Sequence, residues 1–325
     1  MTVRCLVTGG AGYIGAHVVA ALLDKGEEVA VLDDLSTGVA HRVGTARLFV
    51  GDITDRVWTC KTLLEFRPDV VLHFAAKKHV GDSMAQPGAY YLDNVGGLLS
   101  LLDAMRASGC ERIVYSSSCS VYGINEASQV DEDTPTGPIS PYGESKLIGE
   151  WLLADYARAH DIRYVSLRYF NAAGADDSRK LGDPIARNLV PIVLQAHREG
   201  RSVPVFGCDY DTPDGTCVRD YIHVMDLASA HITAARRIDD AARNRTYNLS
   251  SGRGYSVLDV IHAASEVVGE EIPWHDLGRR AGDPPAMVAL PKRAQRELDW
   301  AAKHSSLLEI VGSSWRSHLP SIDAS

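Results

Sequence analysis

Short apolar runs alternate with amphipathic stretches along the first half of the chain. Apolar runs of the buried-strand type lie at 3–8, 29–32, 47–50, 70–73, 112–116 and 164–168. Helical periodicity fills the intervals near 14–25, 55–66, 90–107 and 142–159. Strands that alternate with helices are typical of βαβ units with right-handed crossovers. The pattern therefore predicts an α/β fold with a doubly wound parallel sheet.

This alternation ends at about residue 175. Pro, Gly and Asp then become dense, for example over 209–215 and 283–285, which is typical of loops. We expect one domain over 1–178, with segments near 220–250 returning to it. A smaller, mixed, loop-rich domain over 179–325 would cap the carboxyl ends of the strands, where ligands bind in such sheets.

Glycines join the first apolar run to the first helical stretch. Gly10, Gly12 and Gly15 fit G-x-G-x-x-G, and Gly9 directly precedes them. A backbone without Cβ atoms can approach a pyrophosphate, and the helix N-terminus behind it offers free N–H groups. The second strand ends at Asp33, where a carboxylate can bind ribose hydroxyls and repel a 2′-phosphate. The sequence therefore predicts a Rossmann domain that prefers NAD to NADP.

A Tyr-x-x-x-Lys pair follows a triple serine. Ser140 and Pro141 form a good helix start, which places Tyr142 and Lys146 on one face of the helix. A free tyrosine has a pKa of about 10, and a nearby ammonium and an oxidised nicotinamide would lower that pKa. With Ser118 holding an alcohol oxygen, the three residues predict hydride transfer at a carbinol carbon. The alternative for Ser118 is that it satisfies a backbone group at the strand end.

Composition narrows the range of partners. The chain is 45% hydrophobic and 23% charged, as in ordinary globular proteins. Its net charge of −9 argues against nucleic acid or an anionic membrane as the main partner. The six cysteines form no C-x-x-C pair and no Cys/His cluster. We therefore expect no metal site, reduced cysteines and a cytoplasmic location, and no apolar run is long enough to cross a bilayer.

Further motifs extend this pattern over nearly the whole chain. They are TGGAGYIGAH (8–17), GDI (51–53), HFAAKKHVGDS (73–83), SSSCSVYG (116–123), SPYGESK (140–146), LRYFNAAGA (167–175), VRDYIHVMDLA (218–228) and RRAGD (279–283). On these motifs the chain resembles the extended branch of the short-chain dehydrogenase/reductase superfamily, and within it the UDP-glucose 4-epimerase family. The resemblance implies an NAD-dependent isomerase of nucleotide-sugar and galactose metabolism with UDP-glucose and UDP-galactose as its substrates.

The resemblance also implies roles for individual residues. Ser118, Tyr142 and Lys146 would be catalytic. The implied NAD-binding residues are Gly9, Gly12, Tyr13, Ile14, Gly15, Asp33, Asp34, Ser36, Thr37, Asp52, Ile53, Phe74, Ala75, Lys78, Asn94, Ser116, Tyr142, Lys146 and Tyr169. The implied UDP-sugar-binding residues are Lys78, Ser118, Tyr142, Asn171, Asn188, Val205, Phe206, Arg219, Arg280, Asp283 and Met287. Guanidinium groups suit diphosphate oxygens.

The implied mechanism oxidises and reduces the same carbon. Tyr142 would take the O4 proton while a hydride leaves C4 for bound NAD, and Ser118 would hold O4. The 4-keto sugar would then turn about its diphosphate linkage and receive the hydride on its other face. Net redox change is zero, so the cofactor would act as a bound catalyst.

Two positions depart from the family pattern. Asp34 stands where the acid at the second strand end is usually followed by Asn, which adds negative charge near the adenosine. Met287 stands where members often carry an aromatic or a small residue, at a position associated with admitting N-acetylated sugars.

Three other functions remain open on the sequence. A sugar-nucleotide 4,6-dehydratase commonly needs an Asp-Glu pair after the catalytic serine, where this chain has Cys119-Ser120. An epimerase or decarboxylase for UDP-N-acetylhexosamine, UDP-uronic acid or UDP-pentose is harder to exclude. A non-catalytic NAD-sensing protein would tend to lack Tyr142 or Lys146.

The resemblance further implies a homodimer. In the family, the helices near 90–107 and 142–159 pack against their two-fold mates as a four-helix bundle. We expect these helices to present outward apolar residues, namely Leu98, Leu101, Leu102, Leu147, Trp151 and Leu152.

Overall fold

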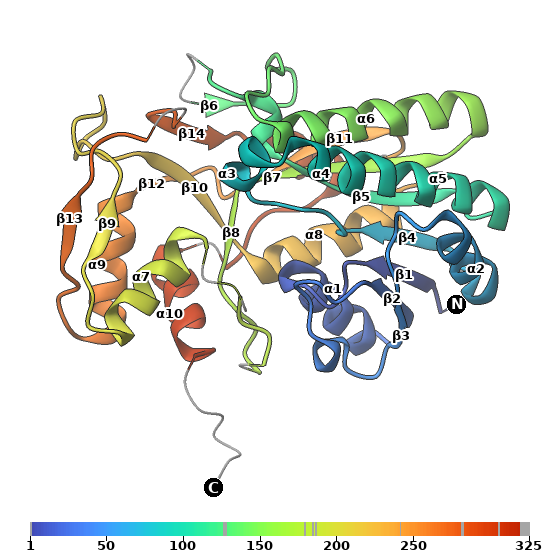
Figure 1. Cartoon of the computed structure of the whole chain (residues 1–325), viewed down its shortest axis with the longest axis horizontal. Coiled ribbons are helices and arrows are strands. Elements are labelled where there is room, and N and C mark those ends of the chain that lie inside the picture. Colours follow the sequence, from blue (N-terminus) through green and yellow to red (C-terminus); the bar gives the residue numbers. More distant parts are fainter. Residues whose placement is uncertain are drawn as a thin grey trace, which may run out of the picture.

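A computed structural model describes residues 2–125, 129–178, 180–183, 185, 187–240, 242–280, 283–304 and 306–318. Within these residues, a parallel sheet of seven strands runs in the order β11-β7-β5-β4-β1-β2-β3 (Figure 1). Its strands are β1 (Arg4–Thr8), β2 (Glu28–Asp33), β3 (Arg47–Val50), β4 (Val70–His73), β5 (Arg112–Ser118), β7 (Arg163–Tyr169) and β11 (Arg245–Leu249). The predicted strands are confirmed to within two residues at either end. The predicted α/β fold class is therefore confirmed.

Helices cover both faces of this sheet. The larger ones are α1 (Tyr13–Asp24), α2 (Arg56–Phe66), α5 (Gly97–Ser108), α6 (Pro141–His160) and α8 (Val224–Arg237). Strand residues alternate between two apolar cores: Val7 and Val31 pack with α1 and α8, whereas Leu6 and Leu32 pack with α2, α5 and α6. This alternation is the period-two pattern of a sheet buried on both faces.

The stretch predicted as one helix over 90–107 is divided. It begins with the last residue of α4 (Pro87–Tyr90), continues with the π-helical turn η2 (Tyr91–Gly96), and ends with α5. Short helices and turns complete this part of the chain: α3 (Val80–Ala85), η1 (Ala40–Val43) and η3 (Cys119–Tyr122). π-helical turns are frequent at functional sites, and Asn94 lies inside this one.

The prediction that leucines face outward was wrong for part of the set. Leu98, Leu101 and Leu102 are fully buried in the core between the sheet and α2. They share one helical face, and that face is the one that packs on the chain's own sheet. Leu147 is also buried, Leu152 is half-buried, and Trp151 alone of the six is exposed.

A smaller unit is formed mainly by the C-terminal part of the chain, with β6 and β8 added from before residue 178. Its mixed sheet runs in the order β12-β10-β14-β6, and β8 also pairs with β10. The remaining strands are β6 (Gln129–Val130), β8 (Asn171–Ala173), β9 (Val203–Val205), β10 (Val218–His223), β12 (Gly254–Ser256), β13 (Trp274–Asp276) and β14 (Ala286–Ala289). Its helices are α7 (Leu189–Arg198), α9 (Val257–Val268) and α10 (Leu307–Arg316). The π-helical turn η4 (Ala294–Leu298) packs instead on the core of the large sheet. Helix α8 and strand β11, which fall near the segments at 220–250, lie with the large sheet. The domain boundary near residue 178 stays a prediction.

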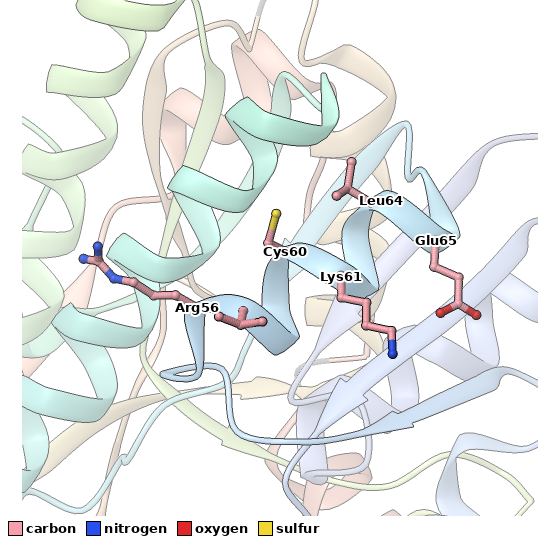
Figure 2. Close-up of a pocket in the computed structure, with 6 residues that line it drawn as sticks. Arg56, Cys60, Lys61, Leu64 and Glu65 are labelled. Atoms are coloured by element: carbon pink, nitrogen blue, oxygen red, sulfur yellow. The ribbon is translucent and has the colours of Figure 1, made fainter.

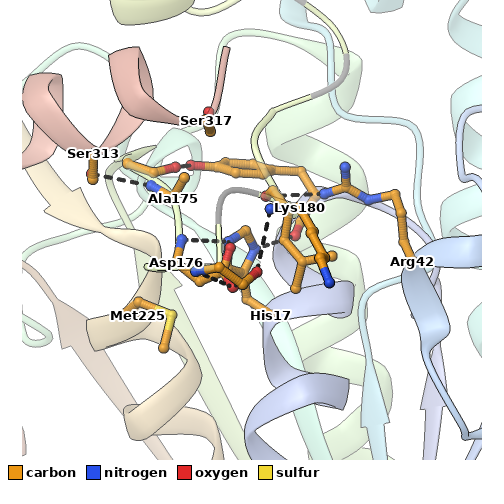
Figure 3. Close-up of polar contacts among 12 residues, drawn as sticks. His17, Arg42, Ala175, Asp176, Lys180, Met225, Ser313 and Ser317 are labelled. Atoms are coloured by element: carbon orange, nitrogen blue, oxygen red, sulfur yellow. Dashed lines mark hydrogen bonds and ion pairs between the residues drawn. The ribbon is translucent and has the colours of Figure 1, made fainter. Parts of the chain in front are cut away.

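Hydrogen bonds link the two units to each other (Figure 3). After β8, the amide of Asp176 donates to Nε2 of His17 on α1 at 3.3 Å, and the amide of Ala175 donates to Oγ of Ser313 on α10 at 3.2 Å. Burial lowers the pKa of His17 to about 4, so the ring is neutral. Its Nδ1 then donates to the carbonyl of Tyr13 at 2.8 Å while Nε2 accepts. These contacts thus reach α1 one helical turn after Tyr13.

No helix among the described residues is long and apolar enough to cross a membrane. All six cysteines are free.

Candidate functional site

A cleft of about 420 Å³ opens along the carboxyl ends of β1, β2, β4, β5 and β7. It is lined by all of the predicted NAD-binding residues except Asn94. Ligand sites of α/β sheets lie at this edge. The structure therefore brings together residues that are up to 160 positions apart in the sequence.

The glycine-rich turn has the close packing that a dinucleotide site requires. Gly9 has a φ of +71°, and a Cβ there would lie 2.6 Å from the amide nitrogen of Ala75. A Cβ on Gly15 would lie 2.2 Å from the carbonyl oxygen of Gly9. Gly12 precedes α1 and offers no side-chain cap, and the first N–H groups of a helix have no acceptor inside it. These residues fit a bound pyrophosphate.

Asp33 and Asp34 differ in their surroundings. Asp33 is buried and accepts hydrogen bonds from the amides of Ala11 and Leu35, both at 2.9 Å. Burial, followed by the charge of Asp34, raises the pKa of Asp33. The Asp34 carboxylate turns back on its own loop and accepts from the amide and hydroxyl of Ser36. Asp33 thus ties the strand end to the glycine-rich turn, and Asp34 stabilises the loop that follows.

Tyr142 and Lys146 lie at the inner end of the cleft. Both are on α6, which begins as predicted with Ser140 accepting from the amide of Gly143 at 3.2 Å. The Lys146 ammonium donates to the carbonyl of Ser116 at 2.8 Å and lies 6.0 Å from the centre of the Tyr142 ring. Tyr169 bonds to the Ser116 hydroxyl. One helix and two strands therefore place these side chains.

The acid–base properties of the pair differ from those expected. Burial raises the pKa of Tyr142, Tyr169 raises it further, and a hydrogen bond with Ser118 lowers it. Burial also lowers the pKa of Lys146 to about 7. In the chain alone, burial therefore outweighs any lowering of the Tyr142 pKa by Lys146, because both groups are desolvated together.

Ser118 and Asn94 lie just behind the cleft. The Ser118 hydroxyl accepts from the amide of Ser120 at 3.1 Å, so it satisfies a backbone group at the strand end while it also faces Tyr142. Asn94 is buried and bonds to the backbone of Lys77 and to the hydroxyl of Ser145. It supports the cleft wall on which Lys78 lies.

The predicted UDP-sugar residues form a second group in the C-terminal unit. The Asp283 carboxylate accepts from Arg280 at 3.0 and 3.1 Å and lies 3.7 Å from Arg219. The Arg280 guanidinium lies over the ring of Phe206 at 5.2 Å. Two guanidinium groups share one carboxylate, so this cluster keeps a net positive charge that suits a diphosphate.

The remaining predicted substrate residues lie on neighbouring elements. Met287 pairs in register with Arg219 between β14 and β10, and Asn171 pairs with Tyr221 between β8 and β10. Asn188 precedes α7 and makes no capping bond. Val205 is buried in the C-terminal core.

Sequence reasoning missed part of the cleft wall. The additional lining residues are Leu32, Gly51, Ala76, Lys77, His79, Asp82, Gln86, Tyr90, Asp93, Asp183, Ile185 and Arg187. Lys77, His79 and Asp82 lie within the HFAAKKHVGDS motif, which could have indicated them. Arg187 lies in no motif, and its bond to Asp82 at 2.7 Å links the C-terminal unit to the rim of the cleft.

A second hollow lies on the outer side of α2 (Figure 2). It is lined by Arg56, Val57, Cys60, Lys61, Leu64 and Glu65, all from this one helix. Because no polar groups converge on it from separate elements, it lacks the features of a catalytic site.

Known proteins share this fold and these motifs. Residues 5–250 match the model of the NAD dependent epimerase/dehydratase family. A UDP-glucose 4-epimerase of Azospirillum brasilense is 44% identical, over 97% of this chain and 92% of its own. The UDP-glucose 4-epimerase of Brucella ovis in complex with NAD is 41% identical with a TM-score of 0.92, over 97% of this chain and 98% of its own. The enzyme of Bifidobacterium longum in complex with NAD+ and UDP is 38% identical with a TM-score of 0.90, over 97% of both chains. The chain therefore belongs to the NAD-dependent epimerase/dehydratase family, and within it to the UDP-glucose 4-epimerases.

Proposed function

We propose that the chain interconverts UDP-galactose and UDP-glucose as an NAD-dependent isomerase. The observation that carries this proposal is the convergence of Tyr142, Lys146 and Ser116 at the inner end of a cleft whose outer part is the glycine-rich turn. The glycine turn and Asp33 suit NAD, and the arginine cluster suits a nucleoside diphosphate. Relatives of more than 40% identity over nearly the whole chain support the same activity.

The residues of the chain divide the chemistry between them. NAD, when bound, supplies a reversible hydride acceptor for C4 of the sugar. Tyr142 takes the proton from O4 during oxidation and returns it during reduction, and Ser118 holds O4 by a hydrogen bond. Arg219 and Arg280 hold the diphosphate, so that the sugar can turn while the nucleotide stays in place.

Incubation of the purified protein with UDP-galactose tests this function. UDP-glucose should appear, and the reaction started from UDP-glucose should reach the same final ratio. Formation of a 4-keto-6-deoxy sugar, or no conversion with either sugar, would contradict the proposal.

We expect NAD to remain bound through purification. The Gly12→Ala variant should fold but lose cofactor, because Gly12 lines the cleft and an added methyl group would take up room that the cofactor needs. The nearest atom to that Cβ would be the carbonyl oxygen of Gly9 at 3.3 Å. Nicotinamide released on denaturation measures the content: about one per wild-type chain. The matched control is Gly88→Ala, whose Cβ meets open space. Wild-type protein without nicotinamide would refute a bound-catalyst role.

We propose a homodimer formed through η2, α5 and α6. These helices lie side by side (Figure 1), joined by bonds from Tyr91 to Glu144 and from Tyr156 to Asp103. Their outer side carries apolar residues, of which Leu92 and Trp151 are 63% and 58% exposed.

The cysteine pattern continues to favour a cytoplasmic location.

Light scattering at micromolar concentration should give twice the mass of the chain. Trp151→Glu should shift the mass to one chain, because it places a charge in an apolar interface. Trp274→Glu, at an exposed tryptophan on β13, should leave the dimer intact. A wild-type mass of one chain would refute the dimer.

Substrate breadth is proposed to depend on Met287. This residue packs in a cluster with Phe170, Leu147 and Cys119, next to the Ser118 end of β5. An apolar wall discriminates a small group by only about 1–3 kcal/mol, so we expect weak activity on the N-acetylated sugars. Met287→Tyr should lower that activity and spare UDP-galactose. An unchanged ratio of the two activities, or equal wild-type efficiency on both, would exclude Met287 from this role.

A further inference from the structure

A buried ion pair links the elements that carry the proposed catalytic groups. Glu150 and Arg168 are 7% and 6% exposed. Their contact is bidentate: Nε of Arg168 donates to Oε1 at 2.8 Å, and Nη2 donates to Oε2 at 2.6 Å. We propose that this pair is a positioning device for Tyr142, Lys146 and Ser118. The proposal rests on the proposed function.

On the helix side, the pair fixes the rotation of α6. Tyr142, Lys146 and Glu150 lie at i, i+4 and i+8, so they share one face of α6. Gly149 lets this face approach the sheet, since a Cβ there would lie 2.2 Å from the hydroxyl of Tyr115. A carboxylate held on that face restrains the direction in which the tyrosine and the lysine point.

On the strand side, the same carboxylate holds the triple serine. The Ser117 hydroxyl donates to Oε1 of Glu150 at 2.5 Å. Ser117 stands between Ser116, which accepts from Lys146, and Ser118, which faces Tyr142. Glu150 therefore restrains the position of α6 relative to β5.

Arg168 extends the restraint to two further elements. It directly precedes Tyr169 on β7, and its Nη1 donates to the hydroxyl of Tyr122 at 3.0 Å. Tyr122 ends the turn that begins after Ser118, and its hydroxyl donates to Asn248 on β11 at 2.7 Å. One guanidinium thus contacts α6 and the turn after β5, and through Tyr122 it is linked to β11.

Stability alone does not account for such a pair. Desolvation of two charges offsets most of their attraction, and well-packed apolar residues are often equally stable in their place. Apolar side chains, however, do not fix direction as a two-point hydrogen-bonded contact does. The pair therefore serves geometry more than folding free energy.

The test uses a variant that removes the pair without leaving a buried charge. Ser117→Ala, Glu150→Leu and Arg168→Met are combined, because each alone would leave a partner unsatisfied. We expect a thermal midpoint close to that of the wild type. We expect kcat for UDP-galactose to fall by about 10–100-fold, the cost of a misplacement of about 1 Å. KM and nicotinamide content should change by less than about twofold, since Arg219, Arg280 and the glycine turn are untouched.

Arg168→Lys provides a second, milder measurement. Lysine keeps the positive charge but cannot make the two-point contact with the Glu150 carboxylate. We therefore expect kcat to fall while KM is unchanged. Arg163→Lys is the matched control: Arg163 begins the same strand and pairs with Glu111 and Asp239 at the opposite end, and its kcat should equal that of the wild type.

The outcomes separate this proposal from the proposed function. If the wild type does not epimerise UDP-galactose, the proposed function fails. If the wild type is active and either the folded triple variant or Arg168→Lys retains wild-type kcat, the positioning role is wrong. A loss of kcat matched by an equal rise in KM or loss of nicotinamide would also overturn it, because that pattern indicates general loosening of the cleft.

Discussion

Replacement of Tyr142 by phenylalanine is expected to lower the rate of UDP-galactose epimerisation by about 10²–10⁴, the usual contribution of a general acid–base group. The substitution removes one oxygen from a buried ring that contacts Tyr90 at 6.5 Å between centroids. Fold and nicotinamide content should therefore survive. Because burial raises the pKa of this phenol in the chain alone, its proton-accepting form depends on positive charge from Lys146 and from the oxidised nicotinamide.

Steady-state kinetics of Tyr142→Phe and Tyr156→Phe would check this expectation. Tyr156 lies on the same helix but bonds to Asp103, away from the cleft, so its variant should keep nearly full activity. A Tyr142→Phe protein with near-normal turnover would remove Tyr142 from the mechanism.

Replacement of Lys146 by methionine should produce opposite effects on activity and stability. Turnover should fall by about 10²–10³, as when one charge-stabilising donor is lost. The free energy of unfolding at pH 7 should rise by an amount on the order of 3 kcal/mol, because burial lowers the folded-state pKa of this lysine from 10.5 to about 7. The lost bond to the Ser116 carbonyl offsets part of the gain.

The pH dependence identifies the cause of that gain. Between pH 7 and 10.5 the unfolded wild type binds more protons at this lysine than the folded protein, so wild-type stability rises with pH across this window. The difference between variant and wild type should therefore shrink as pH increases from 7 to 10. Both proteins are compared without cofactor, since bound NAD would stabilise each by mass action. A variant that is less stable at pH 7 would contradict the claim that desolvation of Lys146 destabilises the folded protein. A stability difference that does not change with pH would contradict it as well.

The sequence was most informative where local pattern determines structure. Apolar runs and the glycine turn located six of the seven strands of the large sheet, all except β11, since these signals depend only on neighbouring residues. The same reasoning failed for Leu98, Leu101 and Leu102. Helical periodicity shows that they share a face, but it does not show whether that face packs on the chain's own sheet or on a second chain.

Site electrostatics were less predictable for a physical reason. The spacing of Tyr142 and Lys146 indicates that they are close, yet their pKa values depend on burial by residues from other elements. Likewise, Glu150 continues the spacing of this pair by one more turn, and Arg168 lies in the LRYFN motif, but only the fold shows that they form one contact. Arg187, which reaches the cleft rim from the other unit, carries no local signal at all.

The central claim is that the chain oxidises and reduces the same sugar carbon with a cofactor that it does not release. UDP-galactose carrying deuterium at C4 tests this claim directly, in purified protein without added NAD. We predict UDP-glucose in which the deuterium remains at C4, with nicotinamide still bound to the protein at the end. Loss of the deuterium to solvent, or a requirement for one added NAD per sugar converted, would contradict the account.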